Sequence, residues 1–204
     1  GSSSRLRMGS TLSRDEMLRL ALMASENRAA STLARHYPGG VDAFVVVMNA
    51  KAKALGLTRT SFADPTGLSP RNVSTANDLA RMVKAAADYP LIREYSTTPA
   101  HYVEVQPTGQ TLGFNNSNAL VKNEAWDIQL QKTGYIREAG RCVVMLATIV
   151  GFATTLIGLV LGEKLMGIPG MILAPVVLHY IKVEASRNKA DDEGADPVKG
   201  PASK

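Results

Sequence analysis

Hydrophobic and polar residues follow a helical spacing near the start of the chain. Ser13 is followed three residues later by Glu16, which is the capping-box pattern of a helix N-terminus, and an apolar face begins at Met17. The proline and glycines at positions 38–40 are typical of a helix end. We therefore expect one helix from about Arg14 to His36.

The next hundred residues predict two further helices and then strands. Apolar positions with helical spacing run from Asp42 to Leu55, and Thr75 caps a third helix that ends near Tyr89-Pro90. Farther on, His101 to Val105 and Trp126 to Gln131 alternate between polar and apolar residues, as strands do. Because the helices come first and the strands later, the sequence predicts an α+β fold.

The pattern changes after Arg141, where interleaved charges give way to apolar runs. No charged residue occurs from Cys142 to Gly162, which meets the length criterion of roughly 20 residues for a membrane helix, and a second run extends from Leu165 to Ile181. We therefore expect a membrane partner for residues 142–181. Alternatively, Cys142 to Val150 forms a strand, which leaves only residues 151–181 for the membrane.

These changes divide the chain into three parts. We expect a soluble domain over residues 1–150 and a transmembrane hairpin over residues 151–184. The tail at residues 185–204 is rich in charge, proline and glycine and has almost no large apolar residue, so it is expected to be disordered.

Composition excludes several classes of function. The formal net charge of +5 is modest and the Lys and Arg residues are scattered, so we expect no nucleic-acid partner. The one cysteine, Cys142, excludes an internal disulfide and a cysteine-rich metal site, and we expect no metal and no cofactor. No apolar core follows the first five residues, so no cleavable signal peptide is expected there.

Several short motifs occur in an order that identifies a family. They are Ser25-Glu26-Asn27 within Leu22–Ala30, the turn sequence from Asp64 to Leu68, and Lys132-Thr133-Gly134 at the end of the last predicted strand. Over residues 4–150 the chain resembles the D-alanyl-D-alanine carboxypeptidases and endopeptidases, which are low-molecular-mass penicillin-binding proteins. An ordered set of motifs is far more specific than either tripeptide alone.

The resemblance implies a fold, an activity and a location. The fold would be part of the penicillin-binding or β-lactamase-like transpeptidase fold. The activity would be a serine-type hydrolysis of peptidoglycan peptides through an acyl-serine intermediate, with a peptidoglycan peptide or a β-lactam as the partner. The location would be the periplasm.

The resemblance also assigns roles to individual residues. Ser25 would belong to the proton shuttle, and Asn27 would hold the substrate amide. Lys132 and Thr133 would bind the terminal carboxylate of the substrate, and Gly134 would leave room for its backbone. Without the flanking motifs, Ser25 would also be compatible with an ordinary serine in a helix, and Lys132-Thr133-Gly134 with an ordinary strand end followed by a turn.

The nucleophile motif of the family is missing from its expected place. A search for Ser-x-x-Lys finds only Ser186-Arg187-Asn188-Lys189, which lies in the charged tail, where no rigid site is expected. We therefore expect an inherited site without turnover. A binding or structural protein that keeps its affinity for peptidoglycan is an alternative class.

The apolar end of the chain has a second resemblance. Residues 152–185, with their glycines and prolines, are similar to the final segment of the autoinducer-2 exporter family of transporters. The basic residues on both sides of the apolar runs place both ends of a hairpin in the cytoplasm, whereas a peptidoglycan peptidase belongs outside. The sequence thus suggests a fusion of unrelated pieces. The alternative function is a transporter segment joined to a non-catalytic peptidoglycan-binding domain.

Overall fold

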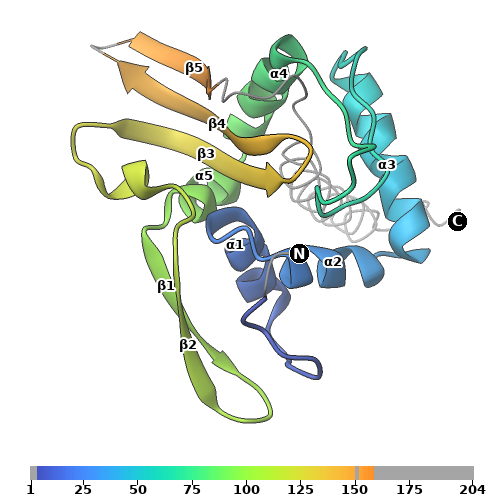
Figure 1. Ribbon diagram of the computed structural model, residues 1–204, viewed down its shortest axis with the longest axis vertical. Helices are drawn as coiled ribbons and strands as arrows, with labels where there is room; N and C mark the ends of the chain where they lie inside the picture. Colours follow the sequence, from blue (N-terminus) through green and yellow to red (C-terminus); the bar gives the residue numbers. More distant parts are fainter. Residues whose placement is uncertain (1–3, 150–151, 159–204) are drawn as a thin grey trace, which may run out of the picture.

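The computed structural model describes residues 4–149 and 152–158, and it contains helices and antiparallel strands in the order that an α+β fold requires. Figure 1 shows the arrangement, with the chain coloured from blue to orange. In chain order the elements are α1 (Arg14–Met23), α2 (Asn27–Arg35), α3 (Gly40–Ala54), α4 (Ala76–Ala87), α5 (Pro90–Thr97), β1 (Ala100–Val105), β2 (Gln110–Asn115), the 3-10 helix η1 (Ala119–Lys122), β3 (Asp127–Ile136), β4 (Gly140–Ile149) and β5 (Phe152–Gly158).

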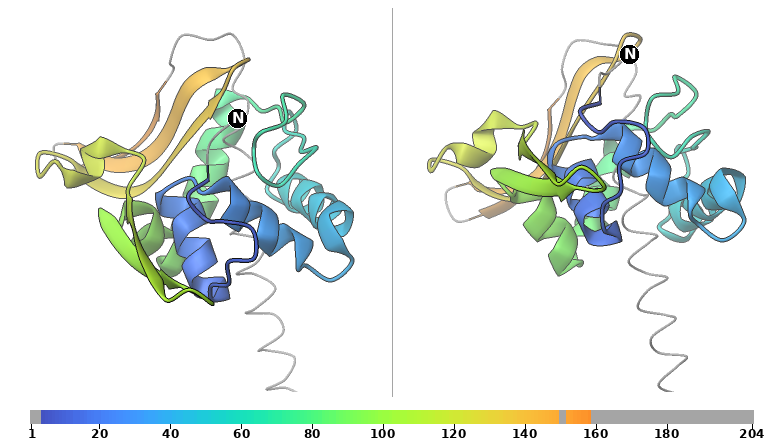
Figure 2. Two further views of the ribbon diagram at one scale, coloured as in Figure 1. Left: turned by 60° about the horizontal axis from the view of Figure 1, so that its bottom comes forward. Right: turned by 90° about the horizontal axis from the view of Figure 1, so that it is seen from below.

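The strands form two separate antiparallel sheets. β1 and β2 make a hairpin that extends away from the larger sheet, in which the strand order is β3-β4-β5 (Figure 1). α4 and α5 pack against the larger sheet, and α1 contacts both α2 and α5. The two turned views show the same layers, with the helices gathered on one side of that sheet (Figure 2). Consequently β3 is an edge strand within the described sheet.

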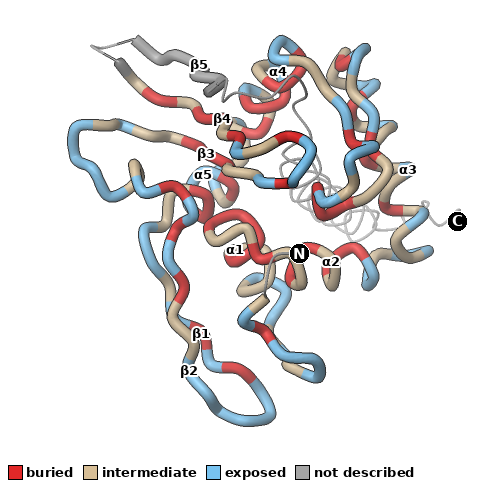
Figure 3. The backbone as a smooth tube through the Cα atoms, in the orientation of Figure 1, coloured by how far each residue is buried: buried red, intermediate tan, exposed pale blue. Residues whose placement is uncertain are grey.

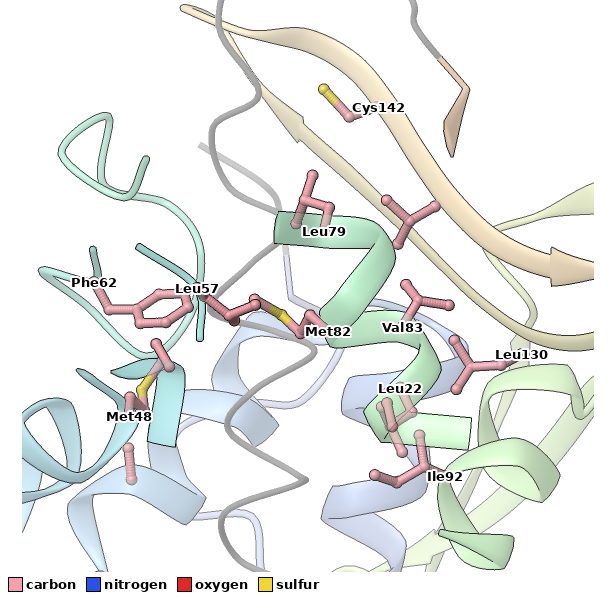
Figure 4. Packing of buried hydrophobic residues seen from close by; sticks show 14 of the residues in the cluster. Leu22, Met48, Leu57, Phe62, Leu79, Met82, Val83, Ile92, Leu130 and Cys142 are labelled. Atoms are coloured by element: carbon pink, nitrogen blue, oxygen red, sulfur yellow. The ribbon is translucent and has the colours of Figure 1, made fainter. Parts of the chain in front are cut away.

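The main core lies between the helices and the larger sheet. Val83 of α4 lies next to Leu130 of β3, and Met82 points to the other side of α4, toward Leu57 and Met48 (Figure 4). Burial follows the same pattern along the chain, with buried positions on the inner faces of α4 and β4 (Figure 3). A smaller apolar cluster joins α1 and α2 to the hairpin through Leu20, Met23, Val103 and Phe114.

The long helix expected from Arg14 to His36 is wrong, because it is two helices. α1 ends at Met23 and α2 begins at Asn27, and Ser25 between them has a left-handed φ of 55°. Left-handed backbone is uncommon for a residue other than glycine and cannot continue a right-handed helix. Ser25-Glu26-Asn27 therefore lies at a helix break and not inside a helix.

The remaining helices begin close to where the sequence places them. α3 and α4 match the expected helices, and the side chain of Thr75 accepts a hydrogen bond from the amide of Asp78.

α5 was not expected. Pro90 occupies its first turn, where the missing proline N–H costs nothing. β2 was not expected either, and β3 continues five residues past Gln131.

The membrane helix expected to begin at Cys142 is wrong for the part that the structure describes. Residues 140–149 and 152–158 are the antiparallel strands β4 and β5, and all of β5 pairs with residues 143–149 of β4. The alternative that Cys142 to Val150 forms a strand is thus confirmed through Ile149. No helix among the described residues is long and apolar enough to cross a membrane.

The rest of the expected hairpin, at residues 159–184, and the tail at residues 185–204 lie outside the described residues. β5 pairs with β4 across the boundary expected at residue 150, so the strand residues 152–158 extend the sheet of the first domain.

Candidate active site

Ser25 is held out of both helices by the backbone on each side of it. The amides of Ala24 and Glu26 both donate to the carbonyl of Leu20, and the Glu26 side chain caps α2 by accepting from the amide of Arg28. These bonds end α1 and start α2 within three residues. The result is a serine hydroxyl that projects from the break toward β3.

The Ser25 hydroxyl meets groups from two other elements. Its Oγ lies 3.2 Å from Ser117 Oγ, 3.3 Å from Thr133 Oγ1 and 3.4 Å from the Thr133 carbonyl. Thr133 Oγ1 donates in turn to Ser117 Oγ at 2.6 Å. Three hydroxyls from the helix break, the loop after β2 and strand β3 therefore converge at one point.

Lys132 is the ionisable member of this group. Its side chain is fully buried, and its ammonium donates to Ser25 Oγ and to the Thr133 carbonyl. Burial lowers the pKa of Lys132 to about 7, because the charged form loses its hydration. Near neutral pH this amine can therefore both give and take a proton.

An open pocket of about 540 Å³ lies in front of these hydroxyls. Its described lining consists of Ser25, Ser117, Thr133, Gly134, Tyr135, Arg141, Cys142 and Val143. This volume is within the usual range for a small ligand. The Lys132 ammonium is not on the pocket wall but behind Ser25, so its contact with a ligand would pass through that hydroxyl.

The other residues expected from the sequence fall in two places. Gly134 lines the pocket and pairs with Cys142 of the neighbouring strand. Asn27 is the first residue of α2, is half-buried and is not among the described lining residues. The structure therefore brings Ser25, Lys132, Thr133 and Gly134 together and leaves Asn27 beside them.

Ser117 is a site residue that the sequence motifs did not indicate. It follows β2, its amide donates to the carbonyl of Met23 at 2.9 Å, and its hydroxyl is exposed to the pocket. Nothing in its neighbours Asn116 and Asn118 distinguishes it from an ordinary turn serine in the sequence. Only the approach of this turn to Ser25 reveals its place.

The outer edge of β3 gives the pocket a second kind of binding group. The Thr133 carbonyl points to this edge, since it accepts from the side chains of Ser25 and Lys132. An edge strand can pair with an extended peptide through main-chain hydrogen bonds.

Within residues 4–149 and 152–158 no group of three or more His, Cys, Asp or Glu residues is placed to hold a metal ion.

Comparison with known proteins gives this site a context. The model of the family described as D-alanyl-D-alanine carboxypeptidase matches residues 1–164. A D-alanyl-D-alanine endopeptidase of Pseudomonas aeruginosa is 56% identical over 149 residues, which is 73% of this chain and 48% of the relative. The D-alanyl-D-alanine endopeptidase of Escherichia coli is 52% identical over 149 residues, which is again 73% of this chain and 48% of the relative. The chain thus spans about half the length of the curated relatives it matches.

Solved structures agree with these matches. A mutant of the streptomyces K15 DD-transpeptidase has a TM-score of 0.68 at 26% identity, covering 92% of this chain and 73% of that one. A D-alanyl-D-alanine carboxypeptidase of Mycobacterium tuberculosis has a TM-score of 0.66 at 25% identity, covering 100% and 73%.

The similarity to an exporter expected for residues 152–185 finds no support in these comparisons. The family match continues through residue 164 and so includes the first part of that segment. None of the relatives named above is an exporter.

Proposed function

From the premise that this chain belongs to the D-alanyl-D-alanine carboxypeptidase family, we propose that its pocket binds peptidoglycan peptides ending in D-alanyl-D-alanine. The family consists of serine peptidases that act on peptidoglycan, and the fold of the described residues is the transpeptidase-like fold of penicillin-binding proteins. A β-lactam would occupy the same pocket. The periplasm is the compartment in which this function would operate.

One observation carries the proposal, namely the convergence of Ser25, Ser117 and Thr133 in front of the buried Lys132. Hydroxyl groups placed together can donate to the two oxygens of a carboxylate. The protonated Lys132 behind them would add its charge through the Ser25 hydroxyl. The edge of β3 would hold the peptide backbone beside them.

Ser25 and Lys132 would have a second role in moving a proton. With a pKa of about 7 the amine is partly neutral at neutral pH, so it can take a proton from the Ser25 hydroxyl and return it. In peptide hydrolysis such a pair would deliver a proton to the leaving amine. Acyl transfer also needs a nucleophile, and the 204 residues contain Ser-x-x-Lys only at residues 186–189. The proposed function of these residues alone is therefore binding without turnover.

Replacement of Thr133 by valine tests this proposal. The change removes the hydroxyl that donates to Ser117 and keeps the shape of the side chain, so we expect roughly tenfold weaker binding of an acetylated D-Ala-D-Ala dipeptide. Isothermal titration calorimetry on the 204-residue chain measures it. Thr111→Val, on the exposed face of β2, is the matched control and is expected to bind like the wild type.

Two outcomes would contradict the proposal. The first is equal binding of the dipeptide by the wild type and Thr133→Val. The second is equal binding of the L-Ala-L-Ala dipeptide, because a pocket that serves this family's substrates must distinguish the two configurations.

A further inference from the structure

Arg141 lies on the wall of the pocket, on the same face of the sheet as Thr133. In the register of β3 and β4, Arg141 is directly opposite Tyr135, and Val143 is directly opposite Thr133. Opposite residues of an antiparallel pair project to one face, and every second residue of a strand returns to that face. Arg141 therefore lies on the same face of the sheet as Thr133, in the next residue pair on that face, and both line the pocket.

Arg141 supplies the charge of this wall. Among the described residues that line the pocket it is the one charged side chain, and no carboxylate is among them. Its guanidinium is exposed and has no hydrogen bond or ion pair within the described part of the chain. Arg137 and Glu138 in the hairpin turn are exposed as well, but neither lines the pocket.

The buried amine strengthens the preference for an anion. Lys132 lies behind Ser25 and not on the wall itself, so in its protonated form it adds positive charge near a pocket that has no described acidic side chain. A carboxylate beside Arg141 would gain two parallel hydrogen bonds from the guanidinium fork as well as the charge interaction.

The spacing along the strand indicates which carboxylate this is. Thr133 and Tyr135 are two residues apart, which corresponds to about 7 Å along a strand, and an extended peptide beside β3 has the same spacing. We propose that Arg141 is a specificity residue that selects peptides with an acidic side chain two residues before the terminal carboxylate. This inference rests on the proposed function, because the hydroxyl cluster must hold the peptide end.

Peptide pairs that differ only in this carboxylate test the inference. The probes are acetyl-Glu-D-Ala-D-Ala and acetyl-Gln-D-Ala-D-Ala, and calorimetry gives their dissociation constants for the 204-residue chain. We expect the wild type to bind the acidic peptide roughly tenfold more tightly, as a charge-assisted pair at a partly exposed site allows. Arg141→Gln is expected to remove this preference, so that the two dissociation constants become equal.

Arg137→Gln is the matched control. It removes an exposed arginine from the same hairpin without changing the pocket wall, so the preference is expected to persist. If the wild type binds both peptides equally, or if Arg141→Gln keeps the preference, the inference about Arg141 is wrong and the proposed function stands. If neither peptide binds the wild type, both are wrong.

Discussion

Replacing Lys132 with methionine is expected to stabilise the protein at acidic pH while weakening its ligand binding. The lysine side chain is fully buried, and burial lowers its pKa to about 7, so its charged form opposes folding. Methionine has a similar volume and no charge to desolvate. The lowered pKa means that the protonated amine is less stable in the folded protein than in the unfolded chain, so removing it is expected to raise the free energy of unfolding at about pH 6, on the order of 2 kcal/mol.

The pH dependence of stability gives this prediction a sharper test. Between a pKa of about 7 in the folded state and 10.5 in the unfolded state, the unfolded chain binds more protons at Lys132. The free energy of unfolding of the wild type therefore rises with pH in this window, by about 2 kcal/mol from about pH 6 to pH 8.5. This rise is expected to disappear in Lys132→Met.

Urea unfolding at the two pH values measures both effects. Lys84→Met is the matched control, since Lys84 is exposed on α4, and it is expected to keep the pH dependence of the wild type. Burial also raises the pKa of the Cys142 thiol, but this contribution is common to all three proteins and cancels in the comparison. An unchanged slope in Lys132→Met would show that Lys132 remains charged when buried.

Incubation with a fluorescent penicillin is expected to leave the 204-residue chain unlabelled. Covalent capture needs an activated nucleophile, and the Ser-x-x-Lys pattern occurs only at residues 186–189. Ser25 is hydrogen-bonded to Lys132, Thr133 and Ser117, and the role proposed for it is to move a proton. Intact-mass spectrometry is the measurement, and about pH 8.5 is the stringent condition because Lys132 is then mostly neutral.

The control for labelling is Ser25→Ala. A wild-type chain that gains the mass of one penicillin, together with a Ser25→Ala chain that gains none, would identify Ser25 as a nucleophile. That result would contradict binding without turnover. Release of D-alanine from a pentapeptide by the wild type would contradict it as well.

The helices were predictable where their ends have local signals. Ser13 and Thr75 accept hydrogen bonds from the amides of Glu16 and Asp78, as the capping patterns indicate. The break at Ser25 has no such signal, because neither glycine nor proline marks it and the flanking residues favour helix. Its left-handed conformation goes with two backbone bonds to the carbonyl of Leu20, from the amides of Ala24 and Glu26, and its hydroxyl contacts Ser117 and Thr133, which are distant in the sequence.

The apolar run after Arg141 shows the limit of hydropathy. A continuous apolar stretch is compatible with a membrane helix and with buried strands. In β4 both faces of the strand carry apolar residues, with Val144 and Ala147 fully buried. α4 packs against this strand, and that contact, which no local pattern encodes, explains much of the hydrophobicity.

The candidate site was predictable in part. Ser25, Lys132, Thr133 and Gly134 belong to recognisable tripeptides, and the fold brings them together. The position of Lys132 behind Ser25 was not predictable, because the alternation of residues in a strand does not show which other element packs over a given side chain. Ser117 was not predictable for the same reason.

Solution NMR can test directly whether the peptide binds at the hydroxyl cluster. In a ¹⁵N-labelled 204-residue chain titrated with an acetylated D-Ala-D-Ala dipeptide, we expect the largest amide shift changes at Ser25, Ser117, Thr133 and Gly134. We also expect Thr133→Val to reduce these changes at the same peptide concentration. Shift changes that are absent, or that are centred on the hairpin β1–β2 away from this pocket, would show that the hydroxyl cluster does not bind the peptide.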